Sequence, residues 1–298
     1  TLPQSTLALA INYQAPSGGM TFWDGQDAHV DPYLSAYTAL SFQWLRQGGY
    51  VVPTLVEKNL HAYLQNMLRT KDVLPSWYDS SMQTTVRAMA IAALSADPKN
   101  VTKEDFDRLT PVLGQMSIFG QALLFEASLA RPALKNWRKT LYQKLMNARE
   151  DQAGGRVRFK EKRGDAWNRW LVSDDQANCA VLSAMVAYGA TPEGETLVGD
   201  LPTRLANSMR LLRKKSWWTS TQDNLFCANA MIDYARRYES TEPDLTVSAR
   251  FNAENMGTTP SLEGYKAQAE IKRPMQANDV NKTNTVTLSK QGDGRAYY

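Results

Sequence analysis

The stretch GGMTFWDGQDAHVDPYLSAY (18–37) decides how the rest of the chain is interpreted. Two glycines and an aromatic run lead into a polar loop, and an amphipathic helix then begins at Asp31 and Pro32. An aspartate just before a helix can accept hydrogen bonds from its first free backbone N–H groups, and proline suits the first helical turn. The stretch therefore predicts a helix whose start is built by the loop before it.

The same arrangement returns along the chain, in SWYDSSMQTT (76–85), RWLVSDDQAN (169–178) and SWWTSTQDN (216–224). Each has one or two aromatic residues, then a cluster of Ser, Thr and Asp, then a run rich in alanine and other small or apolar residues. The helix starts that we expect lie near 32, 80, 117, 173 and 221, at spacings of 48, 37, 56 and 48 residues. This pattern predicts a repeated helical hairpin with insertions between the copies.

Apolar residues recur at helical spacing from residue 1 to about 240. Helices that follow an aromatic and polar lead-in are apolar all round, whereas those between them carry charge on one face, so the former should be shielded and the latter should face water. This alternation predicts a mainly α fold, an α/α toroid of helical hairpins; an open superhelical solenoid is the alternative. We expect helices over 3–14, 32–47, 53–69, 80–95, 103–114, 117–129, 132–148, 173–189, 200–213 and 220–238.

The pattern changes at about residue 243. LTVSARFN (245–252), YKAQAEIK (265–272) and NTVTLSK (284–290) have the composition of strands, and the closing GRAYY has that of a further strand start. Three strands are too few for a sandwich. We therefore expect two parts, an α/α-toroid domain over 1–242 and an incomplete β-sandwich segment over 243–298, within a longer protein.

The composition is that of a globular protein, with 43% hydrophobic and 21% charged residues and a net charge of +4. The basic residues of 156–163 are interpreted as a solvated loop, so neither nucleic acid nor a membrane surface is expected as a partner. No apolar run approaches the roughly 18 residues of a membrane span, and no signal peptide is recognisable.

Few residues are candidates for chemistry. Cys179 and Cys227 lie in apolar helical patterns and are interpreted as buried free thiols; a disulfide between neighbouring helices stays an alternative. His29 and His61 are interpreted as surface or packing residues, and neither has a partner at metal-ligand spacing. We expect no metal and no cofactor.

Asp174 and Asp175 form the one carboxylate pair beside aromatic residues, which on a toroid could serve a glycosidase or a cyclase. Adjacent helical residues point about 100° apart, so helix capping is the preferred interpretation. The aromatic residues of the lead-ins could stack on sugars or bases, but their repeated place before helix starts favours packing. They are Trp23, Trp77, Trp170, Trp217 and Trp218.

Three segments in order resemble the thioester domain of bacterial alpha-2-macroglobulins: GGMTFWDGQDAHVDPYLSAYTALSFQWLRQGGYVVP (18–53), WLVSDDQANCAVLSAMVAY (170–188) and WWTSTQDNLFCANAMIDYARRYE (217–239). The tail GDGRAYY (292–298) resembles the β domain that follows it. The resemblance implies an α/α toroid in a periplasmic protease trap, often anchored to the inner membrane, that is an inhibitor and not an enzyme. In the family, cleavage of a bait region rearranges the trap, and a Cys–Gln thioester can acylate the protease.

The chain departs from this pattern at the thioester, because it contains no Cys-x-Glu-Gln motif: Ala-Val-Leu follows Cys179 and Ala-Asn-Ala follows Cys227. The family motif lies N-terminal to the Gly-Gly-aromatic segment, so either the chain begins after it or it represents a branch that lacks it. By resemblance, Met82 takes the approximate place of a histidine of animal relatives. Tyr78 is the nearest candidate for a thioester-proximal tyrosine, although packing or capping is its preferred role.

Three hypotheses follow. The favoured one is a non-catalytic module of a protease inhibitor, with proteases and the macroglobulin β domains of the same parent chain as partners. The second is a thioester-free scaffold or binding protein of the cell envelope, with envelope proteins as partners. The third is a toroid enzyme that acts on a polysaccharide or a terpenoid.

Overall fold

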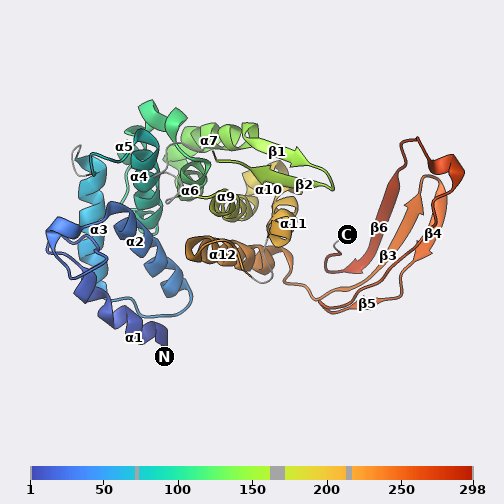
Figure 1. The fold of residues 1–298 in the computed structure, drawn as a ribbon, viewed down its shortest axis with the longest axis horizontal. Coiled ribbons are helices and arrows are strands. Elements are labelled where there is room, and N and C mark those ends of the chain that lie inside the picture. The colour runs from blue at the N-terminus through green and yellow to red at the C-terminus, as the bar shows by residue number, and fades with distance from the viewer. Residues whose placement is uncertain (1, 71–73, 162–171, 213–216, 297–298) are drawn as a thin grey trace. The chain divides into compact units, whose positions relative to one another are not determined.

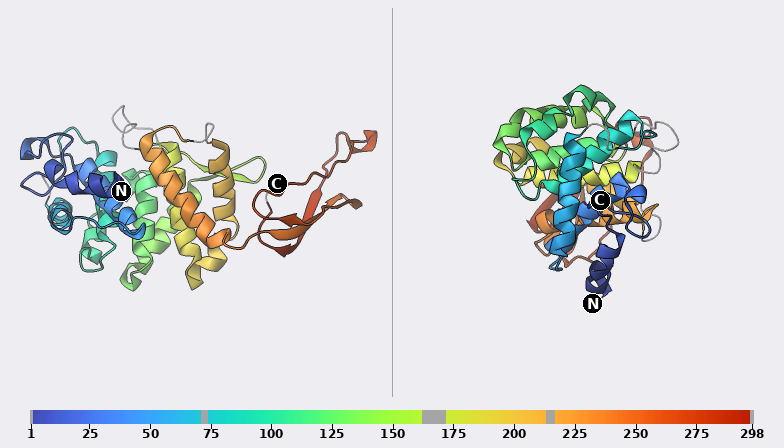
Figure 2. Two further views of the ribbon diagram at one scale, coloured as in Figure 1. Left: turned by 90° about the horizontal axis from the view of Figure 1, so that it is seen from below. Right: turned by 90° about the vertical axis from the view of Figure 1, so that its left-hand side faces the viewer.

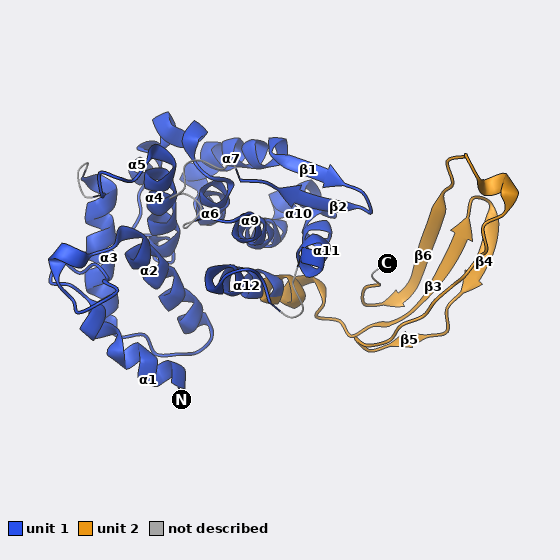
Figure 3. Cartoon of the chain, viewed as in Figure 1, with its two compact units in different colours: residues 1–231 blue, residues 232–298 orange. Residues whose placement is uncertain are grey.

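The computed structural model describes residues 2–70, 74–161, 172–212 and 217–296 (Figure 1). It is mainly α-helical with small antiparallel sheets, which confirms the expected class. The chain forms two compact units, residues 1–231 and 232–298 (Figure 3). No helix among the described residues is both long and apolar enough to span a membrane.

Of the helices at the five predicted starts, α4 (Ser80–Leu94), α6 (Ile118–Ser128) and α9 (Asp174–Gly189) are the most deeply buried in the first unit. These three, together with α2 (Pro32–Gln47) and α12 (Thr221–Tyr238), begin within one residue of the predicted positions. α4 packs against α2 and α6, and α6 packs against α9. Most residues of α4, α6 and α9 are buried, because small and apolar side chains occupy every face of these helices.

The amphipathic helices pack outside them, with α3 (Thr54–Arg69) and α7 (Lys135–Asn147) toward the outside of the first unit in Figure 1. α3 contacts α2 and α4, and α7 contacts α6. α10 (Pro192–Val198) and α11 (Leu201–Leu212) both contact α9. Each of α3 and α11 buries one apolar face and leaves its charged side chains outside.

Three predicted helices are shorter than expected. The helix over 3–14 is α1 (Leu2–Ala8) followed by the 3-10 turn η1 (Leu9–Tyr13), whose Tyr13 carbonyl accepts from Thr21 N–H at 2.9 Å. The helix over 103–114 is α5 (Lys103–Asp107) and η3 (Thr110–Gln115), and that over 132–148 is η4 (Pro132–Leu134) and α7. Pro111 and Pro132 lack the N–H that a continuous helix would need, so each opens a new turn. A further 3-10 turn, η2, covers Asp27–His29.

A hairpin stands where the sequence predicted a solvated loop. β1 (Arg149–Gln152) pairs antiparallel with β2 (Arg156–Phe159), and β2 contacts α11 and α9. Val157 and Phe159 are fully buried. The backbone of Phe159 exchanges two hydrogen bonds with the Asn178 side chain, at 2.9 and 2.7 Å. The loop interpretation was wrong because the arginines hid the two-residue alternation of Val157 and Phe159.

The second unit contains one four-stranded sheet. β3 (Asp244–Phe251) pairs along its whole length with β6 (Val286–Asp293), and on its other side with β4 (Glu254–Thr258) and β5 (Leu262–Glu263) (Figure 2). All pairs are antiparallel, and a 3-10 turn, η5 (Ala277–Asp279), precedes β6. The strand predicted over 265–272 is wrong, because this segment forms no ladder. Its alanines alternate with Lys, Gln and Glu, so it offers little apolar surface to a sheet.

The end of the chain adds no further strand at 295–296, and Tyr297 and Tyr298 lie outside the described residues. The sandwich therefore stays a prediction, as does the boundary between 242 and 243. α12 ends at Tyr238 and β3 begins at Asp244. The boundary between the two compact units falls earlier, between Met231 and Ile232 within α12.

Candidate functional site at the helix starts

The first four inner helices begin with the same side-chain cap. Asp31 accepts a hydrogen bond from the backbone N–H three residues later at 2.7 Å, and Asp79 does so at 2.8 Å. Ser117 and Ser173 accept equivalent bonds at 3.0 and 2.9 Å. Each cap satisfies one of the free N–H groups of the first turn. The capping role predicted for the lead-ins is therefore found at Asp31, Asp79 and Ser173, and Ser117 provides the same cap where no lead-in was predicted.

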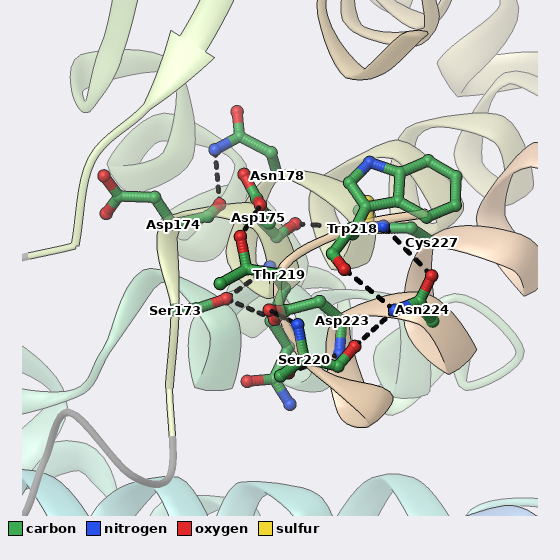
Figure 4. The surroundings of a disulfide bond; sticks show 12 residues. Ser173, Asp174, Asp175, Asn178, Trp218, Thr219, Ser220, Asp223, Asn224 and Cys227 are labelled. Atoms are coloured by element: carbon green, nitrogen blue, oxygen red, sulfur yellow. Dashed lines mark hydrogen bonds between the residues drawn. A yellow bond between two sulfur atoms is a disulfide. The ribbon is translucent and has the colours of Figure 1, made fainter. Parts of the chain in front are cut away.

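α12 begins with a reciprocal pair of bonds. The Asp223 N–H donates to Ser220 Oγ at 3.0 Å, and the Ser220 N–H donates to Asp223 Oδ2 at 3.0 Å. This is the geometry of a capping box with aspartate in the place of glutamate. The other oxygen of Asp223 accepts from the Ser173 hydroxyl, so the caps of α9 and α12 are joined (Figure 4).

Further side-chain contacts connect all five helix starts. We call the side chains that cap and connect these starts the helix-start cluster. The Tyr33 hydroxyl of α2 donates to Gln222 of α12 at 2.6 Å. Thr85 of α4 and the Ser117 cap of α6 share a hydrogen bond of 2.8 Å. These two bonds join the start of α2 to that of α12, and the start of α4 to that of α6. The remaining links run through Tyr78, between α4 and α2, and through Glu161, between α6 and α9.

Glu161 is a member of this cluster that the sequence did not indicate. Its two carboxylate oxygens accept from the N–H groups of Ile118 at 2.9 Å and Phe119 at 2.7 Å, in the first turn of α6. Its own N–H donates to Asp174 at 2.9 Å. Burial raises the pKa of Glu161 to about 7, against the lowering effect of the two N–H groups. A partner 42 residues away leaves no local signal in the sequence.

Asp174 and Asp175 do not act as a pair. Asp174 binds Arg158 Nη2 at 2.9 Å, whereas Asp175 accepts from the Thr219 hydroxyl at 3.4 Å (Figure 4). Burial raises the pKa of Asp175, and the charge of Asp223 adds to the effect. The cap of α9 is Ser173, and the two aspartates follow it in the first turn, where negative charge is favourable.

Tyr78 and Met82 lie in the interior of the first unit. Tyr78 is 2% exposed and Met82 is 1% exposed. Burial raises the pKa of Tyr78, with the charge of Asp31 adding to it and a hydrogen bond from the Tyr33 backbone opposing it. The Met82 N–H donates to the Asp79 cap at 2.8 Å. Both residues thus belong to the helix-start cluster, and their proposed place beside a thioester stays a prediction.

Two of the lead-in tryptophans differ from the packing interpretation. Trp218 is buried, but Trp23, Trp77 and Trp217 are 72%, 55% and 54% exposed. The packing interpretation is therefore wrong for Trp23 and Trp217, whereas the half-exposed Trp77 ring packs edge-on against the buried Tyr78, with 4.5 Å between ring centroids. Trp170 lies outside the described residues.

Cys179 and Cys227 form a disulfide, so the interpretation as free thiols is wrong (Figure 4). The bond joins α9 to α12 with 4.9 Å between the Cα atoms. The separation of 48 residues equals the spacing of the two predicted helix starts, so the cysteines occupy neighbouring repeats. That coincidence is the signal that would have predicted the bond.

The cluster holds side chains in place and presents no cysteine nucleophile, since both thiols are consumed in the disulfide. Among the described residues, no group of three or more His, Cys, Asp or Glu side chains is placed to hold a metal ion. No protein-family model matches the sequence. No curated protein matches it at a significant level.

Solved structures of bacterial alpha-2-macroglobulins are similar in fold. The Escherichia coli protein activated by porcine elastase has 19% identity and a TM-score of 0.63, over 97% of this chain and 23% of that chain. The Salmonella protein reacted with methylamine has 15% identity and a TM-score of 0.60, over 95% and 15%. A native E. coli fragment that runs to the C-terminus has 16% identity and a TM-score of 0.61, over 97% and 38%.

The resemblance expected from the sequence is thereby confirmed at the level of the fold. The chain spans less than half the length of each of these relatives.

Proposed function

We propose that this chain is a non-catalytic module of a bacterial alpha-2-macroglobulin-like protease inhibitor. In this proposal a parent chain traps attacking proteases, and the module contributes a helical body followed by the start of a β-sandwich domain. The observation that carries the proposal is the similarity in fold over 97% of the chain to the E. coli protein activated by elastase. The ordered lead-in segments support it independently.

The toroid is part of this proposal. α2, α4, α6 and α9 pack in sequence, the disulfide continues the series to α12, and the bond from Tyr33 to Gln222 leads from α12 back to α2. A closed series of inner helices with amphipathic helices outside is the arrangement expected of an α/α toroid.

A place in the cell envelope, with the parent in the periplasm and anchored to the inner membrane, is likewise a proposal. The disulfide supports an oxidising compartment, since structural disulfides persist there and are rare in the cytosol. The partners would be proteases, the macroglobulin β domains of the same parent, and envelope proteins.

Trapping can be tested on the full-length protein that carries this chain. It is incubated with elastase or trypsin, and the protease is then assayed on a large protein substrate and on a small peptide substrate. A trap should abolish cleavage of the large substrate and spare that of the small one. Equal activity on both substrates would contradict the proposed function.

A thioester-free scaffold or binding protein of the envelope is the second candidate. The observation behind it is that both cysteines of this chain are used in the disulfide, so neither supplies a thioester. Thiol titration of the intact parent before and after methylamine separates the two chemistries. One new thiol per chain would indicate a thioester elsewhere in the parent, and none would indicate a protein that acts without acylation.

The contacts of Asp174 and Asp175, the carboxylate pair that suggested a toroid enzyme, count against that hypothesis. Glycosidic bond cleavage needs two carboxyl groups that flank one substrate bond. Asp174 is bound to Arg158 and Asp175 to Thr219, so the two serve different contacts.

A further inference from the structure

The first half of α12 buries only a narrow strip of its surface in the first unit. Between Thr221 and Met231 its buried residues are Asp223, Phe226, Cys227 and Ala230, spaced by three or four positions along one face. α6 and α9 are instead buried over most of their surface. A helix with so little buried surface is expected to detach from its unit more easily than its neighbours.

Phe226 and Cys227 are the larger of the buried apolar side chains on this face, beside Ala230. The Phe226 ring lies 5.1 Å from Trp44 and 5.0 Å from Phe119, between ring centroids, so it connects α12 to α2 and α6. Cys227 connects α12 to Cys179 of α9, and both cysteines are fully buried. The disulfide is the covalent link among these contacts.

Polar contacts at the helix start add to this attachment. Ser173 donates to Asp223, Thr219 to Asp175 and Tyr33 to Gln222. Such bonds stabilise a folded state by about 1 kcal/mol each, because water offers alternative partners when they break. They position the start of α12, and the disulfide adds a covalent link to them.

We propose that the Cys179–Cys227 disulfide is a redox-dependent clasp that fixes the first half of α12 against α9. Oxidation closes the clasp, and reduction to two thiols frees this half of the helix to open. The proposal concerns α12 alone and stands whether or not the parent protein traps proteases.

The chemistry is thiol–disulfide exchange. To close the clasp, one cysteine thiolate attacks a sulfur of an oxidant of the protein-disulfide class and forms a mixed disulfide. The second thiolate attacks the cysteine sulfur of that intermediate and releases the oxidant as a dithiol. The chain loses two electrons and two protons, and the oxidant gains them. A dithiol reductant reverses both steps.

Burial of both sulfurs sets the order of events. A reductant can reach the bond only when α12 opens locally, so reduction should be slow while the helix is docked. After reduction the same opening becomes frequent, because the covalent link no longer limits it.

Hydrogen exchange on the full-length protein tests the clasp, with dithiothreitol as the probe. The backbone amides of 225–231 are compared with those of α4 (Ser80–Leu94), in oxidised and in reduced protein under native conditions. We expect exchange in α12 to become at least about tenfold faster on reduction while α4 is unchanged. Equal exchange of α12 in both states, or an equal increase in α4, would overturn the proposal.

The double variant Cys179→Ala, Cys227→Ala provides a second test. It should show the fast α12 exchange without reductant and should not respond to dithiothreitol. If this variant fails to fold, the wild-type comparison decides alone. Alkylation of the oxidised protein in denaturant, without reductant, should modify neither cysteine. Modification of both would mean that the clasp does not form.

Discussion

Two opposing effects act on the pKa of the Glu161 carboxyl group. The N–H groups of Ile118 and Phe119 stabilise its charged form, whereas burial destabilises it. Burial has the larger effect, so the pKa rises to about 7. The folded protein therefore holds a proton on Glu161 at a pH where the unfolded chain has released it. Stability that comes from this proton is present at acidic pH and is lost as the pH rises.

We expect the free energy of unfolding of the wild type, relative to Glu161→Gln, to fall between about pH 4.5 and 7 and to be level above. The rise from the ordinary value of 4.5 to about 7 corresponds to at most ~3 kcal/mol. Urea denaturation of both proteins across this range measures it. Glu150→Gln is the control, because Glu150 lies on the neighbouring hairpin, 45% exposed and paired with Lys160, and this variant should follow the wild type. A constant difference between wild type and Glu161→Gln would refute the assignment.

The helix caps give a second prediction at the scale of single residues. Asp79→Ala removes the acceptor for the Met82 N–H and should destabilise the protein by ~1 kcal/mol. Asp79→Ser keeps a capping oxygen and should restore most of the loss. Thermal unfolding of the two variants measures the difference. If both lose the same stability, the cap is not what Asp79 contributes.

At the scale of elements, the sequence predicts helix starts far better than helix ends or strands. A cap such as Asp31 or Ser173 lies within three residues of its bond partner, so the local sequence carries the full signal. The hairpin over 149–159 depends on Asn178 and on the buried side of β2, which a local pattern does not contain. The segment 265–272 forms no strand because alternation alone does not supply a partner strand.

The candidate site divides in the same way. Caps of the helix-start cluster were predicted, since their chemistry is local. Glu161 and the disulfide join segments that are distant in the sequence, so neither was assigned. The 48-residue repeat would have revealed the disulfide, because both cysteines take nearly the same place in neighbouring repeats. Nothing comparable marks Glu161.

The contact of α10 with α9 supports a prediction about backbone packing. A Cβ at Gly194 would lie 2.0 Å from the carbonyl oxygen of Tyr188, at the end of α9. Gly194→Ala should therefore destabilise the protein by ~2–3 kcal/mol. Gly114→Ala is the matched control, because no atom lies within 4 Å of its Cβ position. It should leave stability unchanged or raise it by up to ~1 kcal/mol. Equal effects in urea denaturation would contradict the close approach.

At the scale of the whole molecule, the two units differ in how much they bury. Within 244–296 the buried residues are Leu245, Ala249, Phe251 and Asp279, whereas the first unit buries most of α4, α6 and α9. All eight tryptophans of the chain lie before residue 232. Tryptophan emission therefore reports on the first unit alone.

We expect the second unit to unfold at a lower denaturant concentration than the first, without a change in tryptophan emission. The reason is its small buried apolar surface, which sets hydrophobic stabilisation. Hydrogen exchange of β3 and β6, followed through a urea titration, should show the early transition. A single transition at one midpoint for exchange and emission would mean that the units unfold together.

The border between the two units falls inside a continuous helix, and this decides where the protein can be cut. Each turn of α12 is held by bonds from an N–H to a carbonyl four residues earlier, so a break after Met231 would sever the ladder in mid-helix. A recombinant fragment of the first part would then end in unpaired carbonyls, and one of the second part would start with uncapped N–H groups. Recombinant fragments are better ended between Tyr238 and Asp244, where the helix has stopped and the strand has not yet begun.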